Sequence, residues 1–386
     1  MNQEPFFTDT VGVMAVILMI PVFFLWLERT TQWKIFHFLP AIIWIFLTPI
    51  FLSNFGVIPR STPIYTTFRS FAVPLFIVLM LLDINVREAL KAWRSVLVMV
   101  AGAFGIVIGA AAAFFAFRSV LPPDSWSGFG ALAGSWIGGT GNLAAVAESL
   151  STPDEFVGVV VVVDNFVYLA YFPIILTSRH WAGWFNRFTR VAEKQPDRVA
   201  DLSVESKRQE VHFRHVLTLL GFGFAAILAS NYLAKLVPEL PPVLTEKTWA
   251  MLLVTTIALA LSATPLKNVP GTAPLSMTFV YIYMTMIGAS ADLRELAGAQ
   301  WFLVAGFVCI AVHFLFIVLA ARWFRVDVSM AAVSSVAAVG GMASAPIAAG
   351  FHRKELVPVS IMLALVGYAL GNFLGVGTAL LCHLLA

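Results

Sequence analysis

Long apolar runs separated by short polar connections dominate the hydrophobic pattern of this chain. Ten of the runs are uniformly apolar: about 8–27, 36–52, 66–82, 95–117, 156–177, 213–235, 247–262, 272–289, 299–321 and 357–385. A helix of roughly 20 apolar residues crosses a hydrocarbon core about 30 Å thick. The pattern therefore predicts ten transmembrane helices. No basic residue precedes the first run, so we expect a retained helix and not a cleaved signal peptide.

Two further apolar segments, 126–149 and 328–350, carry glycines and polar residues where a plain span would not. The first contains the stretch GSWIGGTGNLAAVAESL, which begins at Gly134, and the second contains GGMAS, which begins at Gly340. One glycine costs a helix only about 1 kcal/mol, but several glycines clustered with Thr140 and Asn142 weaken it seriously. We therefore expect both segments to be interrupted near these glycines.

Basic residues in the connections predict the orientation of the chain. The connection 178–214 is strongly basic, as is the one that contains Arg87, Lys91 and Arg94, so the positive-inside rule places both in the cytoplasm. If 126–149 were one ordinary crossing, these connections would lie on opposite sides. A re-entrant hairpin at 126–149 removes the conflict, and a second hairpin at 328–350 keeps its basic flanks inside. The exceptions, left near the outer face, are Arg60, Arg69, Lys235 and Lys247.

The two halves of the chain share an order of motifs. REALKAW at Arg87 resembles RELAGAQW at Arg294, GGTGN precedes EFV in the first half, and GGMAS precedes ELV in the second. The charge pattern places Arg87 inside and Arg294 outside, so the repeats are inverted. We expect an all-α polytopic membrane protein built from two inverted repeats, each with five transmembrane helices and one re-entrant hairpin. The repeats are residues 1–177 and 213–386, and residues 178–212 form a cytoplasmic linker.

Unwound backbone is tolerated at membrane depth only where protein or a water-filled cavity satisfies its amide groups. Two hairpin tips that enter from opposite faces should therefore meet near the midplane and form a binding site. Tight helix packing through small residues is the alternative interpretation. We favour the interruption for the paired glycines of the two tips, and packing for the last run, where the small residues are Gly367, Gly371 and Gly375.

Asp164 lies near the middle of the run FVGVVVVVDNFVYLAYFP. A carboxylate at this depth costs several kcal/mol unless it is protonated, paired or hydrated. We predict that Asp164 binds a coupling cation, as a proton acceptor or as an oxygen ligand to sodium, and assign Asn165, Asn142 and Gly139 to the same ion site. The alternative is a structural aspartate that is hydrogen-bonded to the opposed hairpin.

Hydroxyl groups, amides and glycines near the two tips are candidates for binding a solute. The predicted substrate-binding residues are Ser135, Thr140, Gly141, Ser335, Gly340, Gly341, Ser344 and Asn372. A hydroxyl that bonds back to its own helix is the more common fate of any single serine or threonine. His313 is a candidate proton relay, but a lone histidine is more often a satisfied contact between helices.

Composition narrows the function. The 386 residues are 60% hydrophobic and 12% charged, with a net charge of +3 and a mean hydropathy of +0.88. Metal-hydrolase, serine-hydrolase and phosphate-loop signatures are absent from the sequence, so we expect no enzyme activity and no resident cofactor, with sodium only as a coupling ion. The modest charge, concentrated in the connections, predicts no nucleic-acid partner. Cys309 and Cys382 lie in apolar runs and read as inert thiols.

The stretches GSWIGGTGNLAAVAESL, VVVVVDNFVYLAYFP and GGMASAPIAAGFHRKELVPVSIMLALVGYALGN resemble those of the YjcL-like family (DUF819) of bacterial and plant-plastid membrane proteins. The resemblance covers nearly the whole chain. Its architecture is similar to the sodium/glutamate symporters and 2-hydroxycarboxylate carriers, which implies a dimer with an elevator motion, in which the tips at Gly138 to Asn142 and Gly340 to Ser344 hold ion and substrate. The second tip departs from the first because it has no asparagine.

These observations predict a multi-pass protein of the bacterial inner membrane that is a secondary transporter. It would couple sodium or protons to a small organic solute, such as an amino acid, a short peptide or a carboxylate, and would work as a homodimer in the lipid bilayer. A cation/proton antiporter is the first alternative, and would show proton flux without an organic solute. A channel would need a continuous polar lining, and an intramembrane enzyme would turn over without a gradient.

Overall fold

The computed structural model describes residues 5–31, 33, 35–38, 41–82, 84, 91–191, 210–291 and 300–386. Within these residues the chain is helical apart from its connections and one isolated β-bridge between Leu240 and Leu244. Eight helical stretches are long and apolar enough to cross a membrane, as a multi-pass membrane protein requires. The repeated motifs at Arg87 and Arg294, and residues 192–209 of the predicted linker, lie largely or wholly outside the described residues.

One group of helices, here called the first bundle, combines the opening helices of both halves of the chain. Its members are α1 (Thr10–Thr31), α3 (Ala41–Asn54), α4 (Pro63–Leu82), α11 (Phe213–Ala234), α12 (Glu246–Ser262) and α13 (Thr272–Ser290). Helix α13 packs on α3 and α4, and α12 packs on α4 and α11. Within the predicted run 36–52, the structure describes α2 (Ile35–Phe38) and α3.

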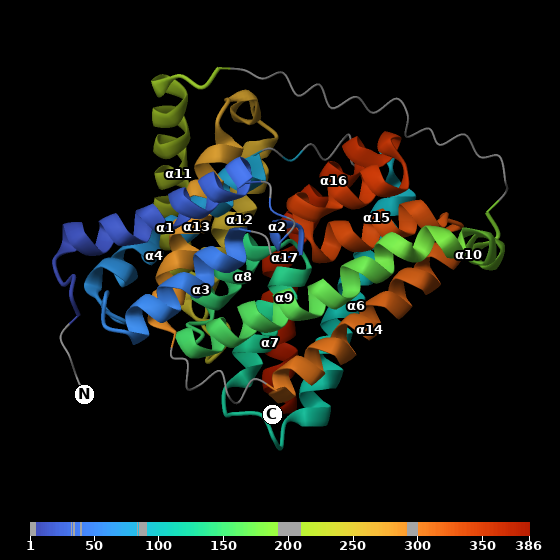
Figure 1. The fold of residues 1–386 in the computed structure, drawn as a ribbon, viewed down its shortest axis with the longest axis horizontal. Helices are drawn as coiled ribbons and strands as arrows, with labels where there is room; N and C mark the ends of the chain where they lie inside the picture. The colour runs from blue at the N-terminus through green and yellow to red at the C-terminus, as the bar shows by residue number, and fades with distance from the viewer. Residues whose placement is uncertain are drawn as a thin grey trace.

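The second bundle contains the remaining long helices of both halves. They are α6 (Trp93–Phe117), α7 (Ser125–Trp136), α8 (Thr140–Ser149), α9 (Asp154–Thr177), α14 (Gln300–Phe324), α15 (Val328–Val339), α16 (Gly341–His352) and α17 (Val357–Leu385). Helix α9 continues through η1 (Ser178–Trp181) into the short α10 (Ala182–Thr189). Figure 1 shows α1, α3, α4, α11, α12 and α13 on one side of the molecule, and α6, α10, α14, α15 and α16 on the other.

Glycine allows α6 and α14 to pack closely in the second bundle. A Cβ atom added to Gly109 would lie 2.8 Å from the carbonyl oxygen of Cys309, and one added to Gly105 would lie 3.1 Å from the Cα of His313. The two backbones therefore approach closely along this contact, as small residues permit in membrane helices. The thiol of Cys309 is buried and donates to the carbonyl of Ile106 at 3.3 Å, so it serves this contact.

The two unusual segments each form a pair of short helices that fold back on each other. In the α7–α8 pair, a Cβ atom on Gly134 would lie 2.9 Å from Val146, and one on Gly130 would lie 3.0 Å from Leu150. Gly134, near the break, thus faces Val146, and Gly130, farther from the break, faces Leu150. The two helices are therefore antiparallel. The α15–α16 pair is closed at its base, where the cap residues Asp327 and Arg353 form an ion pair of 2.8 Å.

The bases of the two helix pairs, which are the ends farthest from the breaks, lie at opposite ends of the second bundle. Arg118, which ends α6, donates to the carbonyl of Leu385 at the end of α17, and the ring of Trp126 contacts His383. The base of the α7–α8 pair therefore lies at the end of the bundle where α6 finishes. Trp93, which begins α6, packs on Phe324 just before α15. The base of the α15–α16 pair therefore lies at the other end.

A seam joins the two bundles. It is formed by α4 with α8, α12 with α8 and α17, and α13 with α9. At the seam, Gly141 at the start of α8 lies against Met80 of α4, because a Cβ atom there would come within 2.8 Å of the Met80 sulfur. The α7–α8 pair is thus held from one side by α17 of its own bundle and from the other by the first bundle.

Candidate functional site

The two helix breaks adjoin in the interior of the second bundle. A Cβ atom on Gly341 would lie 3.3 Å from the carbonyl oxygen of Gly138 and equally close to the ring of Tyr368, and one on Gly139 would lie 3.4 Å from the same ring. Gly139 and Gly341 have φ angles of 93° and 56°, which favour glycine because L side chains rarely adopt them. We call the two glycine breaks together with Tyr368 the tip junction.

Asn142 fastens the first break to α17. Its side-chain amide donates to the carbonyl of Tyr368 at 3.0 Å, and it fills the space over Gly138 and Gly371, where a Cβ atom would collide with it. The amide thus reaches a backbone carbonyl inside a helix, which few other groups can approach. In this conformation Asn142, predicted as an ion ligand, holds the break against α17.

Asp164 faces the first helix pair from α9. Its two carboxylate oxygens accept hydrogen bonds from the hydroxyl of Ser135 at 3.0 Å and the indole N–H of Trp136 at 2.7 Å, both at the end of α7. Two donors occupy only part of the capacity of a carboxylate, which can accept about four hydrogen bonds. Predicted residues Asp164 and Ser135 are thus brought together, and Trp136 joins them.

Tyr168 lies one turn after Asp164 on the same face of α9 and reaches the second break. A Cβ atom on Gly340 would lie 2.5 Å from the Tyr168 hydroxyl, and Ser344 borders the same space. The hydroxyl oxygen is buried without a hydrogen-bond partner. Tyr168 is not among the residues predicted from the sequence. One pattern could have found it: Tyr168 and Tyr368 are 200 residues apart, as are Glu155 and Glu355 of the repeated EFV and ELV motifs, so the two tyrosines occupy matching positions of the repeat.

Asn165 points away from the tip junction. Its amide donates to the carbonyl of Val161 on its own helix at 2.7 Å, and its side chain lines a small apolar cleft between α9 and α3. Consecutive residues of a helix point about 100° apart, which accounts for the separation from Asp164. The structure therefore does not bring Asn165 to the predicted ion site.

Ser335 belongs to a buried hydrogen-bond chain that joins four helices. Nδ1 of His313 lies 2.9 Å from the carbonyl of Gly102, which can only accept, so Nδ1 carries the hydrogen. Nε2 then accepts from the hydroxyl of Ser335 at 2.9 Å, and the hydroxyl of Tyr171 donates to Ser335 at 2.7 Å. All of these side-chain groups have partners, so the chain clamps α6, α9, α14 and α15 together.

The remaining predicted substrate residues lie at different distances from the tip junction. Thr140 is half-buried at the first break, and Ser344 is half-buried beside the second. Asn372 lies at the seam, where its amide donates to Thr255 of α12 at 2.9 Å and its carbonyl oxygen is buried without a partner. Reversing the amide would leave its NH2 group unpaired, so one polar atom of Asn372 lacks a partner in either orientation.

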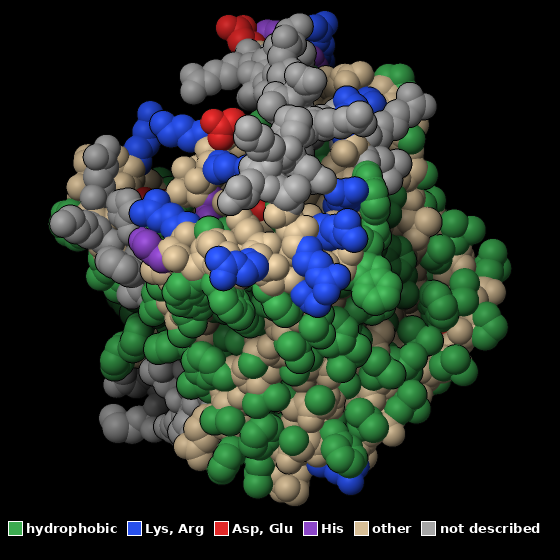
Figure 2. Space-filling view, turned by 90° about the vertical axis from the view of Figure 1, so that its right-hand side faces the viewer, with side chains coloured by type: hydrophobic (Ala, Val, Ile, Leu, Met, Phe, Trp, Pro, Cys, Tyr) green, Lys and Arg blue, Asp and Glu red, His purple; other side chains and the backbone are tan. Residues whose placement is uncertain are grey.

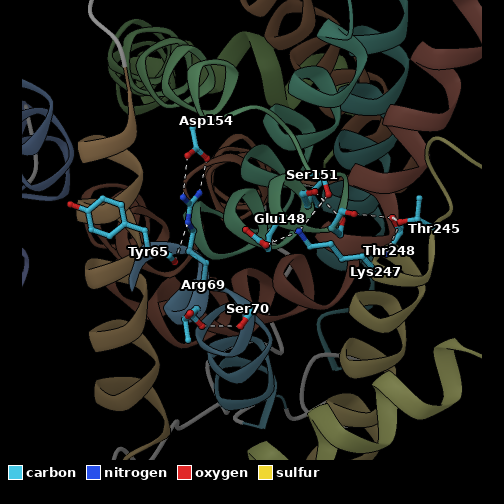
Figure 3. A network of polar contacts seen from close by, with 12 residues as sticks. Tyr65, Arg69, Ser70, Glu148, Ser151, Asp154, Thr245, Lys247 and Thr248 are labelled. Atoms are coloured by element: carbon cyan, nitrogen blue, oxygen red, sulfur yellow. Dashed lines mark hydrogen bonds and ion pairs between the residues drawn. The ribbon is translucent and has the colours of Figure 1, made fainter. Parts of the chain in front are cut away.

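Two ion pairs cross the seam near the base of the α7–α8 pair (Figure 3). The guanidinium of Arg69 on α4 binds both carboxylate oxygens of Asp154 on α9, at 2.6 and 3.1 Å. Lys247 on α12 binds Glu148 on α8 at 2.7 Å. Arg69 and Lys247 were exceptions to the charge pattern, and these pairs explain why cations are accommodated there.

The geometry brings one carboxylate, several hydroxyls and two helix breaks into one region of the second bundle. Among the described residues, no group of three or more His, Cys, Asp or Glu side chains is arranged to hold a metal ion. Asp164 and the hydroxyl of Ser135 offer hard oxygen atoms, which suit a proton or an alkali cation better than a transition metal.

Comparison with known proteins identifies the family of this chain. The chain matches a family described as "Protein of unknown function (DUF819)" over residues 15–384. It is also 31% identical over 339 residues to the "Uncharacterized membrane protein YjcL" of Bacillus subtilis (strain 168), an alignment that covers 84% of this chain and 85% of the relative. The chain is therefore a multi-pass membrane protein that belongs to the DUF819 family.

Proposed function

We propose that this protein is a secondary transporter that couples a cation, sodium or a proton, to the movement of a small organic solute. One observation carries the proposal: two helix breaks adjoin beside the carboxylate of Asp164. Interrupted helices at membrane depth are a feature of carriers, because the ends of half-helices offer polar backbone groups to an ion or solute.

Asp164 is the proposed ion ligand. Its carboxylate oxygens retain lone pairs beyond the bonds from Ser135 and Trp136, and these lone pairs can hold a proton or contact a sodium ion. Binding of a cation would offset the cost of a carboxylate in this apolar bundle. The hydroxyl of Tyr168, one turn after Asp164 on α9, borders the second break, where a solute would bind.

The solute is proposed to lie at the tip junction. Helices α8 and α16 both begin there, at Thr140 and Gly341, so the positive ends of two helix dipoles meet. This arrangement favours an anionic group such as the carboxylate of an amino acid, a short peptide or an organic acid. Tyr168, Ser344 and Tyr368 lie beside the breaks, and their hydroxyls can offer further hydrogen bonds.

Alternating access is proposed to follow an elevator motion of the second bundle against the first. Two inverted repeats, each with five transmembrane helices and one re-entrant pair, would make α3 equivalent to α12, α4 to α13, and α6 to α14. They would account for the contacts of α4 with α13 and of α6 with α14, and for the matched contacts of α3 with α13 and of α12 with α4. The bases of the two helix pairs lie at opposite ends of the second bundle, which also supports inverted repeats. We assign the first bundle as the scaffold of a homodimer.

Stabilisation of the purified protein by cations tests this function. Sodium or acidification should raise the melting temperature of the wild-type protein, relative to choline at constant ionic strength, because a ligand that binds the folded state stabilises it. The variant Asp164→Asn should lose this response, and a matched variant of an exposed acid, Glu239→Gln, should keep it. A full response in Asp164→Asn would overturn the assignment.

Uptake into proteoliposomes distinguishes coupled transport from cation/proton exchange. With an imposed sodium or proton gradient, candidate amino acids, short peptides and organic acids should accumulate in vesicles that contain the wild-type protein and not in those that contain Asp164→Asn. Proton flux that needs sodium but no organic solute would instead establish a cation/proton antiporter.

A further inference from the structure

The end of the second bundle that holds the base of the α15–α16 pair is strongly basic. Five described elements or their flanks meet there: the start of α6, η1 with α10, the end of α14, the start of α15 and the end of α16. We call their cations the basic belt, which consists of Lys91, Arg94, Arg179, Arg187, Arg190, Arg322, Arg325, Arg353 and Lys354. Acidic residues in the same elements are Asp327, which is paired with Arg353, and Glu355.

Helix α10 lies along this end as a short amphipathic helix. Phe185 and Thr189 are buried, whereas Arg187 and Arg190 are exposed. The exposed fraction is 51% for Trp181 and 67% for Trp184, and Trp323 at the end of α14 is 83% exposed. Tryptophan and basic residues together are typical of the level of lipid headgroups. Figure 2 views this side and shows Lys and Arg forming a band above a largely hydrophobic surface.

Contacts of α10 connect the basic belt to the second helix pair. The side-chain oxygen of Asn186 accepts from the backbone N–H of Val328, the first residue of α15, at 3.0 Å. Arg322 of α14 donates to the carbonyl of Phe188 and lies 4.7 Å above its ring. A group bound to α10 would therefore lie beside the base of the α15–α16 pair.

We propose that the basic belt binds the headgroups of anionic phospholipids, with Arg187 and Arg190 of α10 as the principal contacts. The excess of cations over acids provides charge complementarity to a phosphodiester at the membrane surface. The exposed tryptophans position α10 at the headgroup level, and the planar guanidinium groups suit bidentate binding of phosphate oxygens. This lipid contact does not depend on the proposed transport activity.

Thermal unfolding of the full-length protein in detergent, with added lipid, tests the proposal. Phosphatidylglycerol should raise the melting temperature more than phosphatidylcholine of the same acyl chains, and added salt should weaken that difference because headgroup contacts are screened. The variant Arg187→Gln with Arg190→Gln should lose at least about half of the phosphatidylglycerol-specific increase. Inorganic phosphate alone should not reproduce it.

The matched control removes two cations from the other end of the molecule. Arg118→Gln with Lys235→Gln lowers the net charge equally and should keep the full lipid response. The conservative variant Arg187→Lys with Arg190→Lys should retain part of it, so a folded comparison remains if the glutamine variant is unstable. Equal stabilisation by both lipids, an unchanged response in the glutamine variant, or an equal loss in the control would each overturn the proposal.

Discussion

At the scale of single residues, two tyrosines on α9 differ in the hydrogen bonding of their hydroxyls. Tyr171 donates to Ser335 at 2.7 Å and thereby supports the buried chain through His313. Tyr168, three positions earlier, directs a buried hydroxyl with no partner toward the second break near Gly340. A buried polar group without a partner is costly, so it is retained where a ligand or a second conformation supplies the missing bond.

This difference predicts opposite outcomes for the same substitution. Tyr171→Phe removes a satisfied hydrogen bond and should lower the stability of the purified protein by about 1 kcal/mol while keeping its cation response. Tyr168→Phe removes an unpaired hydroxyl, so it should leave the melting temperature unchanged or higher but weaken solute uptake. Melting temperature and proteoliposome uptake are measured for both variants. Unchanged uptake with Tyr168→Phe would exclude the hydroxyl from the site.

At the scale of helices, α17 is shaped to receive the first break. A Cβ atom on Gly375 would lie 3.0 Å from the carbonyl of Gly130, and Gly371 lies directly against the amide of Asn142. Both glycines face α7 and α8, so they serve close packing and not flexibility. The interpretation of Gly367, Gly371 and Gly375 as packing residues agrees with these contacts.

Two glycines of α17 provide a matched test of this packing. In Gly371→Ala the added Cβ collides with Asn142, and overpacking of a tight contact should lower stability by about 2 kcal/mol. Gly377→Ala on the same helix meets no atom within 4 Å and should be neutral or slightly stabilising, because alanine favours a helix. The measurement is the apparent melting temperature. Adding Asn142→Ala to Gly371→Ala should restore part of the loss, and no restoration would contradict the collision.

The sequence pattern predicts where the helices are interrupted better than it predicts which side chains become hydrogen-bond partners. The clustered glycines and Asn142 weaken a helix locally, so the breaks follow from composition. Trp136 could not be foreseen as a partner of Asp164, because a tryptophan in an apolar run is usually core and only the fold turns its N–H toward α9. The orientation of Ser335 toward His313 likewise depends on how α14 and α15 pack, which no local pattern encodes.

At the scale of the whole molecule, the seam decides how the two bundles can move. The first bundle contributes Arg69 and Lys247, and the second contributes Asp154 and Glu148. These ion pairs lie at one end of the seam, near the base of the α7–α8 pair. If the second bundle moves against the first, both pairs must separate, so their strength sets the population of the arrangement described here.

The two pairs should differ in strength, because the side chain of Arg69 is 11% exposed and that of Lys247 is 47% exposed. Asp154→Asn removes the carboxylate from a largely buried guanidinium and should cost about 2 kcal/mol. Glu148→Gln affects a more exposed pair and should cost less than about 1 kcal/mol. The exchange of Arg69→Asp with Asp154→Arg should recover part of the first loss, measured as melting temperature.

The same variants also report on movement at the seam. Thr152 lies between Glu148 and Asp154 in the sequence, is buried, and has a hydroxyl with no partner, so Thr152→Cys is a mild change that places a thiol beside the two ion pairs. The native thiols, Cys309 and Cys382, are both buried. Asp154→Asn should make the new thiol react faster with a water-soluble maleimide, because weakening the pair populates an arrangement in which the seam is open. The exchanged pair should slow the reaction again. Equal rates in all three backgrounds would mean that the ion pairs do not hold the seam closed, and that any movement of the second bundle is limited elsewhere.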